Sequence, residues 1–262
     1  SSFSFSGTSL SSALTLLGGI IHRAKITRAD RPISELLTDW TATDHIFYDV
    51  HTYLPQVYLC FLKFIGINST EERKEVFTDH ESEKRVADFL QSHNIQPTDI
   101  LVGISVTAGN PVKEWGDEKF LELAQRIDAT LGAKVMFIGS PWDEKRISAL
   151  ATGDFIKATV FDLKNLPALI KRCSFFISGD TGPMHIANAL GVPLVDIIGP
   201  VHPGELAPKD SKSMIVLPDP YVAPTIFAFG KPGPADLTRQ ALKNISVERV
   251  FNVLTELQKN IR

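Results

Sequence analysis

The sequence has little of several residue types, and each shortage excludes a class of protein. Only two cysteines, Cys60 and Cys173, occur among 262 residues, far apart and within apolar segments. They are interpreted as buried thiols, which suit a reducing compartment, and not as a disulfide framework or a metal pair. The seven histidines are scattered without the spacing of a metal site, so we expect neither a metal nor another cofactor.

An excess of basic charge and a long apolar run are also missing. The net charge is −3, which excludes the basic surface expected of a nucleic-acid-binding protein. No apolar stretch reaches the length that crosses a bilayer, and the first residues lack the basic start of a signal peptide. With 44% hydrophobic residues, the chain can bury the core of one large or two ordinary domains. We therefore expect a soluble, cytoplasmic protein.

The most informative stretch covers residues 176–191. An apolar segment ends at Asp180, Pro183 follows where a first helical turn tolerates a missing N–H, and Gly191 closes an apolar helix. In a parallel sheet, such strand–turn–helix connections lie at the carboxyl ends of strands, where the first N–H groups of the helix attract anions. The pattern predicts a site for a phosphate-bearing small molecule, although Asp180 or Thr181 could equally serve only as a helix cap.

From residue 100 onward, apolar strand patterns alternate with helical ones. We expect strands at 100–104, 134–138, 159–161, 174–177 and 213–217, and helices at 117–131, 143–150, 165–172 and after Ser246. This alternation predicts βαβ units, a parallel sheet and a Rossmann-like layer. Residues 67–99 have the charged composition of an interdomain segment, in which 69–74 are interpreted as exposed and 82–92 as an amphipathic helix.

The first part of the chain is less regular. A helix-like spacing ends at Gly19 and precedes a strand at 21–26, whereas residues 28–50 are interpreted as loop-rich. A packed helix is expected over 51–66, with His51 in a structural role. Residues 218–234 are rich in proline and glycine and are expected to cover the surface as loops.

Several motifs, in this order, resemble one family. The likeness rests on Asp180-Thr181-Gly182-Pro183-Met184-His185, the Ala-Leu-Gly-Val-Pro after it, Ile198-Gly199-Pro200, Lys113-Glu114-Trp115 and the turn at 137–141. These motifs are similar to the signature of glycosyltransferase family 9, the lipopolysaccharide heptosyltransferases. The resemblance implies an α/β fold of GT-B type with two Rossmann-like domains. It implies an N-terminal acceptor-side domain over 1–80 that lacks its first βα units here, a nucleotide-sugar domain over 81–245, and a C-terminal helix over 246–262 that braces the first domain.

The resemblance also assigns roles to residues at the carboxyl ends of the strands. Lys113 and its loop, which includes Thr107, are expected to contact a diphosphate together with Thr181 and Gly182. Asp180 is expected to bind sugar hydroxyls rather than phosphate, and His185 to reach the phosphates or the sugar. Asp143 or Glu144 is expected to bind the ribose, and Phe161 the base. Each has a plainer alternative. Lys113 could be an ordinary exposed lysine, and Asp143 and Glu144 could be acids that favour a helix start. Phe161 could be a core residue, and His185 a helix histidine bonded to a carbonyl.

The implied function is inverting transfer of a heptose or related sugar without a metal. The donor would be a nucleotide-diphosphate sugar, by resemblance ADP-heptose, and the acceptor a lipopolysaccharide core or similar glycan. Work on such an acceptor implies peripheral association with the inner face of the inner membrane. The family's base is an aspartate in the first βα turn, for which we find no counterpart, so no catalytic residue is assigned. Another nucleotide-sugar enzyme of GT-B architecture and a non-catalytic nucleotide-binding or scaffold protein stay open as alternatives.

Overall fold

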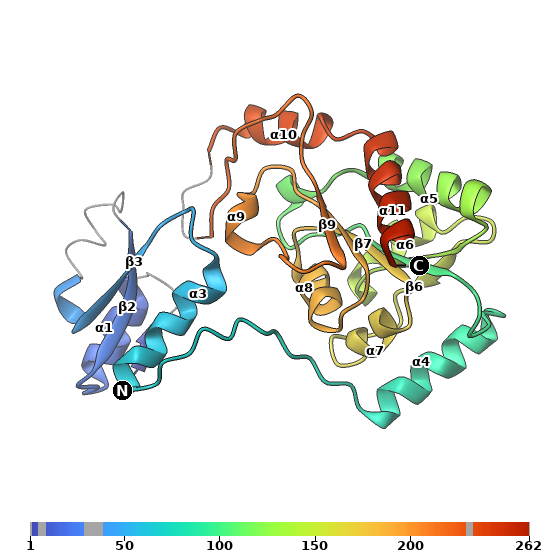
Figure 1. Ribbon diagram of the computed structural model, residues 1–262. Coiled ribbons are helices and arrows are strands. Elements are labelled where there is room, and N and C mark those ends of the chain that lie inside the picture. Colours follow the sequence, from blue (N-terminus) through green and yellow to red (C-terminus); the bar gives the residue numbers. More distant parts are fainter. Residues whose placement is uncertain (1, 5–8, 29–38, 229–232, 262) are drawn as a thin grey trace. The chain divides into compact units, whose positions relative to one another are not determined.

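The computed structural model describes residues 2–4, 9–28, 39–228 and 233–261, which divide into two compact units (Figure 1). The first unit comprises residues 1–73, 202–206 and 226–232. The second comprises residues 74–201, 207–225 and 233–262. The chain thus changes unit between Arg73 and Lys74, and two short later segments return to the first unit. The continuous domains expected from the sequence do not include this return.

A three-stranded parallel sheet in the order β1-β2-β3 forms the centre of the first unit. Its strands are β1 (Ser2–Ser4), β2 (Arg23–Arg28) and β3 (Asp44–Tyr48). The accompanying helices are α1 (Ser9–Leu17), α3 (Leu54–Leu59) and α9 (Pro203–Leu206), with the 3₁₀ turns η1 (Asp39–Thr41) and η2 (Cys60–Ile65). The core consists of Ala24, Ile26, Tyr48, Leu54, Val57 and Phe61.

Two expectations for the first unit need correction. The region interpreted as loop-rich contains β3, because Ile46 and Tyr48 alternate inward while Phe47 points to solvent. The helix expected over 51–66 is an α-helix of one and a half turns followed by η2. Gly66 ends that 3₁₀ turn with a φ of 78°, a left-handed conformation that glycine adopts without strain.

The second unit is built on a six-stranded parallel sheet in the order β6-β5-β4-β7-β8-β9. Its strands are β4 (Leu101–Ser105), β5 (Lys134–Ile138), β6 (Ile156–Ala158), β7 (Phe175–Gly179), β8 (Leu194–Ile197) and β9 (Ser213–Val216). The first strand, β4, lies in the middle, so the chain builds the sheet outward on one side and then on the other. This is the strand order of a doubly wound, dinucleotide-binding sheet, which has a switch point between its first and fourth strands.

Helices cover both faces of this sheet. One face packs against α5 (Asp117–Leu131), α6 (Glu144–Leu150), α10 (Ala235–Lys243) and α11 (Val247–Ile261). The other packs against α4 (His80–Ser92), α7 (Leu166–Lys171) and α8 (Gly182–Ala189). The 3₁₀ turns η3 (Pro111–Lys113) and η4 (Pro141–Asp143) follow the ends of β4 and β5. The alternation of strands and helices therefore gives the expected Rossmann-like layer.

The centre of the sheet leaves no room for a side chain at Gly103. A Cβ there would lie 2.7 Å from the sulfur of Cys173 and 3.0 Å from the ring of Phe176. The thiol of Cys173 is buried against β4, as the sequence predicted, whereas Cys60, also expected to be buried, is only partly so. Among the described residues, no helix combines the length and the apolar character needed to cross a bilayer.

One expected strand of the second unit is wrong in position, and one helix was not expected. The strand expected at 159–161 lies at 156–158, because pairing with β5 sets Ile156 opposite Met136 and buries Ile156 and Ala158. The helix α10 begins directly after the proline- and glycine-rich region and was not expected. The C-terminal helix α11 packs on α5, β8 and β9 within the second unit.

Candidate functional site

A cavity of about 640 Å³ opens at the carboxyl edge of the second unit's sheet. Its walls come from the segments that follow β4, β5 and β6, and from the first residues of α8. It therefore lies beside the switch between β4 and β7, where doubly wound sheets bind ligands. Of the residues expected to bind a ligand, Thr107, Asp143, Phe161, Thr181 and Gly182 line this cavity. Lys113, Glu144, Asp180 and His185 are not among its lining residues.

The first turn of α8 presents its N–H groups to the cavity without a side-chain cap. Thr181 occupies the N-cap position, but its side chain makes no cap hydrogen bond. Its hydroxyl lies 3.0 Å from the hydroxyl of Ser178 instead. Pro183 stands in the first turn, where a missing N–H costs nothing. Because Thr181 and Gly182 line the cavity, this helix start can accept an anion through its amides and its dipole.

An ion pair joins the segments that follow β4 and β7. The ammonium of Lys113 lies 2.8 Å from a carboxylate oxygen of Asp180, and their side chains are 22% and 5% exposed. The exposed lysine considered as an alternative is therefore not what the structure shows. Asp180 directly precedes Thr181, so the pair places one positive and one negative group next to the uncapped helix start.

The two acids considered for the ribose have different surroundings. Asp143 lines the cavity, and one of its oxygens accepts hydrogen bonds from the backbone N–H and the hydroxyl of Ser140 at 2.9 and 2.6 Å. Glu144 is bonded to Lys157 and to the hydroxyl of Thr159, which hold its carboxylate beside β6. Asp143 is therefore the acid that faces the cavity, although it also closes the capping box at the start of the η4 turn.

Phe161 forms part of the cavity wall at the β6 end of the sheet. Because β6 ends at Ala158, Phe161 lies in the loop beyond the strand and not within it. Its ring packs edge-on against Phe89 at a centroid distance of 5.0 Å, and the guanidinium of Arg85 lies 5.6 Å from its centroid. Arg85 is itself held by Asn165 and by the carbonyl of Val160. The buried phenylalanine is thus both a core residue and an apolar wall.

His185 lies one turn into α8 and contacts a residue from the interunit segment. The ammonium of Lys74 is 3.3 Å from His185 Nδ1 and 3.1 Å from Asn188 Oδ1. Burial, followed by the charges of Lys74 and Lys113, lowers the pKa of His185 to about 4, while Asp180 acts in the opposite sense. The expectation that Lys74 belongs to an exposed charged run is therefore wrong, since its ammonium contacts two side chains of α8.

A buried carboxyl lies close to the same charges. Asp196 on β8 is 0% exposed, and neither of its carboxyl oxygens has a hydrogen-bond partner among the described residues. Burial, and then the charge of Asp180, raises the pKa of Asp196 well above its ordinary value, whereas Lys113 and Lys74 act in the opposite sense. Asp196 interrupts the apolar run from Leu194 to Ile198, a signal that could have singled it out, but sequence reasoning gave it no role.

The rim of the cavity carries exposed apolar side chains that sequence reasoning also missed. Trp142 lines the cavity and is 96% exposed, and Leu163 lines it and is 76% exposed. Large apolar side chains left in water on either side of an opening are typical of a ligand-binding surface. The available signal was the position of Trp142 directly after the β5 turn.

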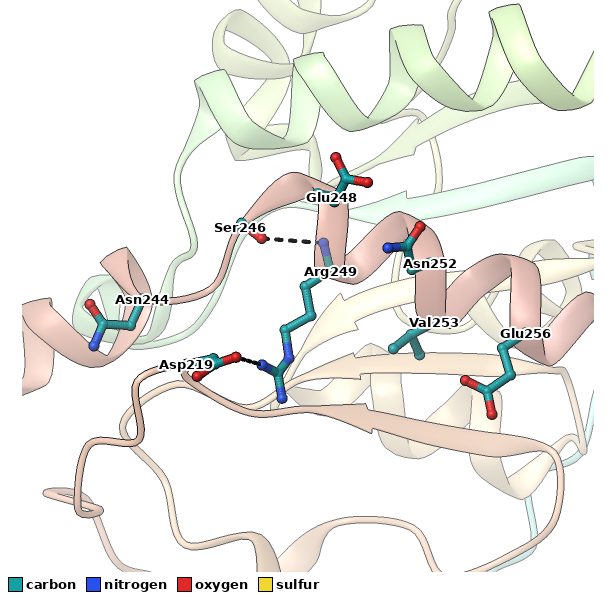
Figure 2. Close-up of a pocket in the computed structure, with 8 residues that line it drawn as sticks. All are labelled: Asp219, Asn244, Ser246, Glu248, Arg249, Asn252, Val253 and Glu256. Carbon is teal, nitrogen blue, oxygen red and sulfur yellow. Dashed lines mark hydrogen bonds and ion pairs between the residues drawn. The ribbon is translucent and has the colours of Figure 1, made fainter.

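A second, smaller hollow of about 280 Å³ lies where α11 begins. Its lining residues are shown in Figure 2. Arg249 forms an ion pair with Asp219 at 2.6 Å, and its backbone N–H donates to the hydroxyl of Ser246. The side chain of Asn244 donates to the carbonyl of Pro220. These polar groups bond to one another and to the backbone, so they hold the start of α11 in place. Ser246 acts there as the expected helix cap.

No metal site accompanies the cavity in the described part of the chain, where no three histidine, cysteine, aspartate or glutamate side chains are grouped for an ion. Positive groups at or near the cavity include the amides of α8 and the side chains of Lys113 and Arg85. Such groups suit a phosphate-bearing ligand.

Comparison with known proteins finds one family over most of the chain. The family model described as "Glycosyltransferase family 9 (heptosyltransferase)" matches residues 5–226. A lipopolysaccharide core heptosyltransferase of Haemophilus influenzae is 26% identical over 209 residues, which cover 77% of this chain and 56% of that protein. The chain therefore spans about half the length of the curated relative.

Solved structures share the fold. A glycosyl transferase of family 9 from Veillonella parvula superposes with a TM-score of 0.69 at 22% identity, covering 95% of this chain and 77% of that one. The ADP-heptose lipopolysaccharide heptosyltransferase II of Escherichia coli gives a TM-score of 0.68 at 19% identity, covering 99% and 76%. The expected α/β fold of GT-B type is confirmed.

Proposed function

This chain belongs to glycosyltransferase family 9, and from that premise we propose that it transfers a heptose or related sugar from a nucleotide-diphosphate sugar to a glycan acceptor. The donor we propose is ADP-heptose, and the acceptor is a lipopolysaccharide core or a similar glycan. The Haemophilus relative and the Escherichia coli structure bear the names of lipopolysaccharide heptosyltransferases, which supports this choice. We further propose that the protein works in the cytoplasm and meets its acceptor at the inner face of the inner membrane.

The observation that carries the proposal is the uncapped start of α8. Thr181 is the N-cap residue, but its side chain makes no hydrogen bond to the backbone of the helix. Both Thr181 and Gly182 line the cavity. A diphosphate placed there would accept hydrogen bonds from backbone amides at the positive end of a helix. Lys113 lies beside this point, and a phosphate oxygen would offer its ammonium a second partner besides Asp180.

The rest of the cavity fits the nucleoside. Asp143 faces it from the β5 turn and can accept hydrogen bonds from ribose hydroxyls, as acids at this place do in dinucleotide-binding sheets. Phe161, Trp142 and Leu163 supply apolar surface for a base. On this reading, Asp180 serves the sugar hydroxyls, because a carboxylate accepts hydrogen bonds from hydroxyls and repels phosphate.

The proposed reaction inverts the anomeric centre. The acceptor oxygen forms a bond to the anomeric carbon as the bond from that carbon to the β-phosphate oxygen breaks, and the nucleoside diphosphate leaves with the electron pair. A general base takes the acceptor's proton; no described residue is assigned that role. The chain's own contribution is electrostatic, since the α8 amides and Lys113 stabilise the charge that grows on the leaving diphosphate.

Calorimetric titration with ADP tests the binding half of the proposal. Lys113→Met removes a charge-assisted contact, which is worth about 1.5–3 kcal/mol, so ADP affinity should fall about 10- to 150-fold. Lys134→Met is the matched control, because this exposed lysine starts β5 at the opposite edge of the sheet. Equal ADP affinity in the wild type and in Lys113→Met would contradict the site.

The transfer half needs its own measurement. Release of ADP from ADP-heptose should require the glycan acceptor and should be slower in Lys113→Met at saturating donor. Tight ADP binding without acceptor-dependent release would favour the non-catalytic alternative. Turnover of a hexose donor in place of ADP-heptose would favour another nucleotide-sugar transferase.

A further inference from the structure

The contact between Lys74 and His185 fixes where the imidazole carries its proton. An ammonium group has three donors and no acceptor, so the ring nitrogen that it approaches must hold a lone pair. That nitrogen is Nδ1, at 3.3 Å from Lys74 Nζ. In a neutral ring the proton then belongs to Nε2. Among the described residues, no acceptor lies within hydrogen-bond distance of His185 Nε2.

We infer that Lys74 is a positioning residue that holds His185 as the neutral Nε2–H tautomer, so that α8 presents one more hydrogen-bond donor to the diphosphate or the sugar. The inference rests on the proposed function for the identity of the ligand. It assigns a task to a residue of the segment between the two units, in which sequence reasoning expected an exposed charge. Lys74 acts through His185, since it contacts the α8 side chains of His185 and Asn188.

The ammonium is held in place from a second side. Asn188 lies one turn after His185 on α8, and its side-chain oxygen accepts from Lys74 at 3.1 Å. The amide nitrogen of Asn188 donates to Asp210, which fixes the orientation of the amide. Lys74 is therefore bound by two acceptors spaced as neighbours on one helical face, and movement of its ammonium away from His185 would break both contacts.

The surrounding charges agree with a neutral ring. His185 faces the charges of Lys74, Lys113 and Asp180, and burial contributes the largest effect to its low pKa of about 4. Lys74 faces Asp210, Asp196 and Asp180, which offset part of the loss of its hydration. With one carboxylate against two ammonium groups near the ring, the imidazole stays neutral through the whole physiological range.

Nitrogen NMR of the full chain tests the inference without any ligand. In the wild type, His185 Nδ1 should give the shift of an unprotonated ring nitrogen and Nε2 that of a protonated one, with no change between pH 5.5 and 8. The His185→Gln variant assigns the signals. In Lys74→Met the tautomers should mix, and the pKa of His185 should rise from about 4 toward its ordinary 6.5. Lys74→Arg, which keeps both charge and donors, should restore the wild-type pattern.

ADP titration supplies the functional readout. In Lys74→Met, affinity should fall by less than in Lys113→Met, and it should gain a pH dependence above pH 4, because loss of the Lys74 charge raises the pKa of His185. Wild type and Lys74→Arg should lack this dependence. Lys212→Met is the matched control. Lys212 contacts the carbonyl of Gly191 just beyond α8, so this substitution removes an equal charge from the same neighbourhood.

The outcomes separate the two proposals. A proton on Nδ1 in the wild type, or an unchanged tautomer and pKa in Lys74→Met, would overturn the inference. The same holds if Lys212→Met changes His185 as much as Lys74→Met does. The expected tautomer pattern together with no ADP binding in any variant would overturn the proposed function, and leave Lys74 as the group that sets the His185 proton.

Discussion

The indole nitrogen of Trp115 donates a hydrogen bond of 2.9 Å to the carbonyl of Ile245, 130 residues later in the chain. The same carbonyl accepts from the ammonium of Lys119 at 2.8 Å, and the Trp115 ring packs edge-on against Phe120. Trp115 follows the segment that carries Thr107 and Lys113. The connection between α10 and α11 is thereby tied to the base of a loop that borders the cavity.

Replacing Trp115 with phenylalanine should therefore lower the free energy of unfolding. The change keeps an aromatic ring but removes the indole donor and part of a buried side chain, with an expected cost of about 1–3 kcal/mol. Urea denaturation measures this cost. Trp142→Phe is the control, because that side chain is 96% exposed and should change stability by less than about 0.5 kcal/mol. Equal effects in the two variants would contradict the role given to Trp115.

Asp180→Asn should separate the sugar from the diphosphate. The substitution removes the negative partner of Lys113, whose ammonium lies 2.8 Å from the carboxylate. A phosphate then meets a lysine with no competing carboxylate, so ADP should bind at least as tightly as in the wild type. ADP-heptose should lose affinity, because an uncharged amide accepts weaker hydrogen bonds from hydroxyls than a carboxylate does. Calorimetry with both ligands decides the matter, and a parallel loss of both affinities would assign Asp180 to the diphosphate.

Trp142→Ala should weaken nucleotide binding without a cost in stability. An aromatic contact is worth about 0.5–1.5 kcal/mol, so the affinity for ADP should fall about 2- to 13-fold. Of the three tryptophans, Trp115 is buried and Trp40, 73% exposed, does not line the cavity. Quenching of tryptophan fluorescence by ADP bound in the cavity should therefore be lost in the variant. Inorganic pyrophosphate should bind the two proteins equally. A loss of pyrophosphate affinity would show that the indole does more than cover a base.

Asp196→Asn should stabilise the protein in a pH-dependent way. The folded protein raises the pKa of Asp196, chiefly by burial, so the folded state binds its proton more tightly than the unfolded state does. Stability from this group is complete below the unfolded pKa, near 3.8, and falls as the pH rises toward the folded pKa. The asparagine variant has no such loss. Its gain in unfolding free energy should be small at pH 4 and larger at pH 7 in urea titrations. A pH-independent difference would contradict the raised pKa of a buried carboxyl without a hydrogen-bond partner among the described residues.

The sequence predicts the regular parts of the second unit well, because local pattern and tertiary environment agree there. The helix at 117–131 and the strand at 134–138 have the observed bounds, since Gly132 ends the helix and the strand is apolar and buried after Lys134. The strand beside them was shifted by three residues. Val160 and Phe161 carry the stronger strand preference, but pairing with β5 selects Ile156 and Ala158.

The site was predicted as far as it depends on one loop at a time. Thr107, Asp143, Thr181 and Gly182 follow strand ends, so the sheet alone brings them to one edge. Whether a charged side chain takes part in the site depends on contacts with residues far away in sequence. Lys74 meets His185 and Asn188 more than a hundred residues later. Nothing in a run of glutamate, arginine and lysine distinguishes the lysine that will meet this partner from its neighbours.

The position of β4 has a consequence for how this half of the protein is made. As the polypeptide leaves the ribosome, β4 gains β5 as a neighbour quickly, but its other edge waits for β7, more than seventy residues later. Until then an apolar strand displays unpaired backbone groups in the middle of the future sheet. A nascent chain stalled before Phe175 should therefore be a chaperone client, whereas one stalled after β7 should already protect its own centre.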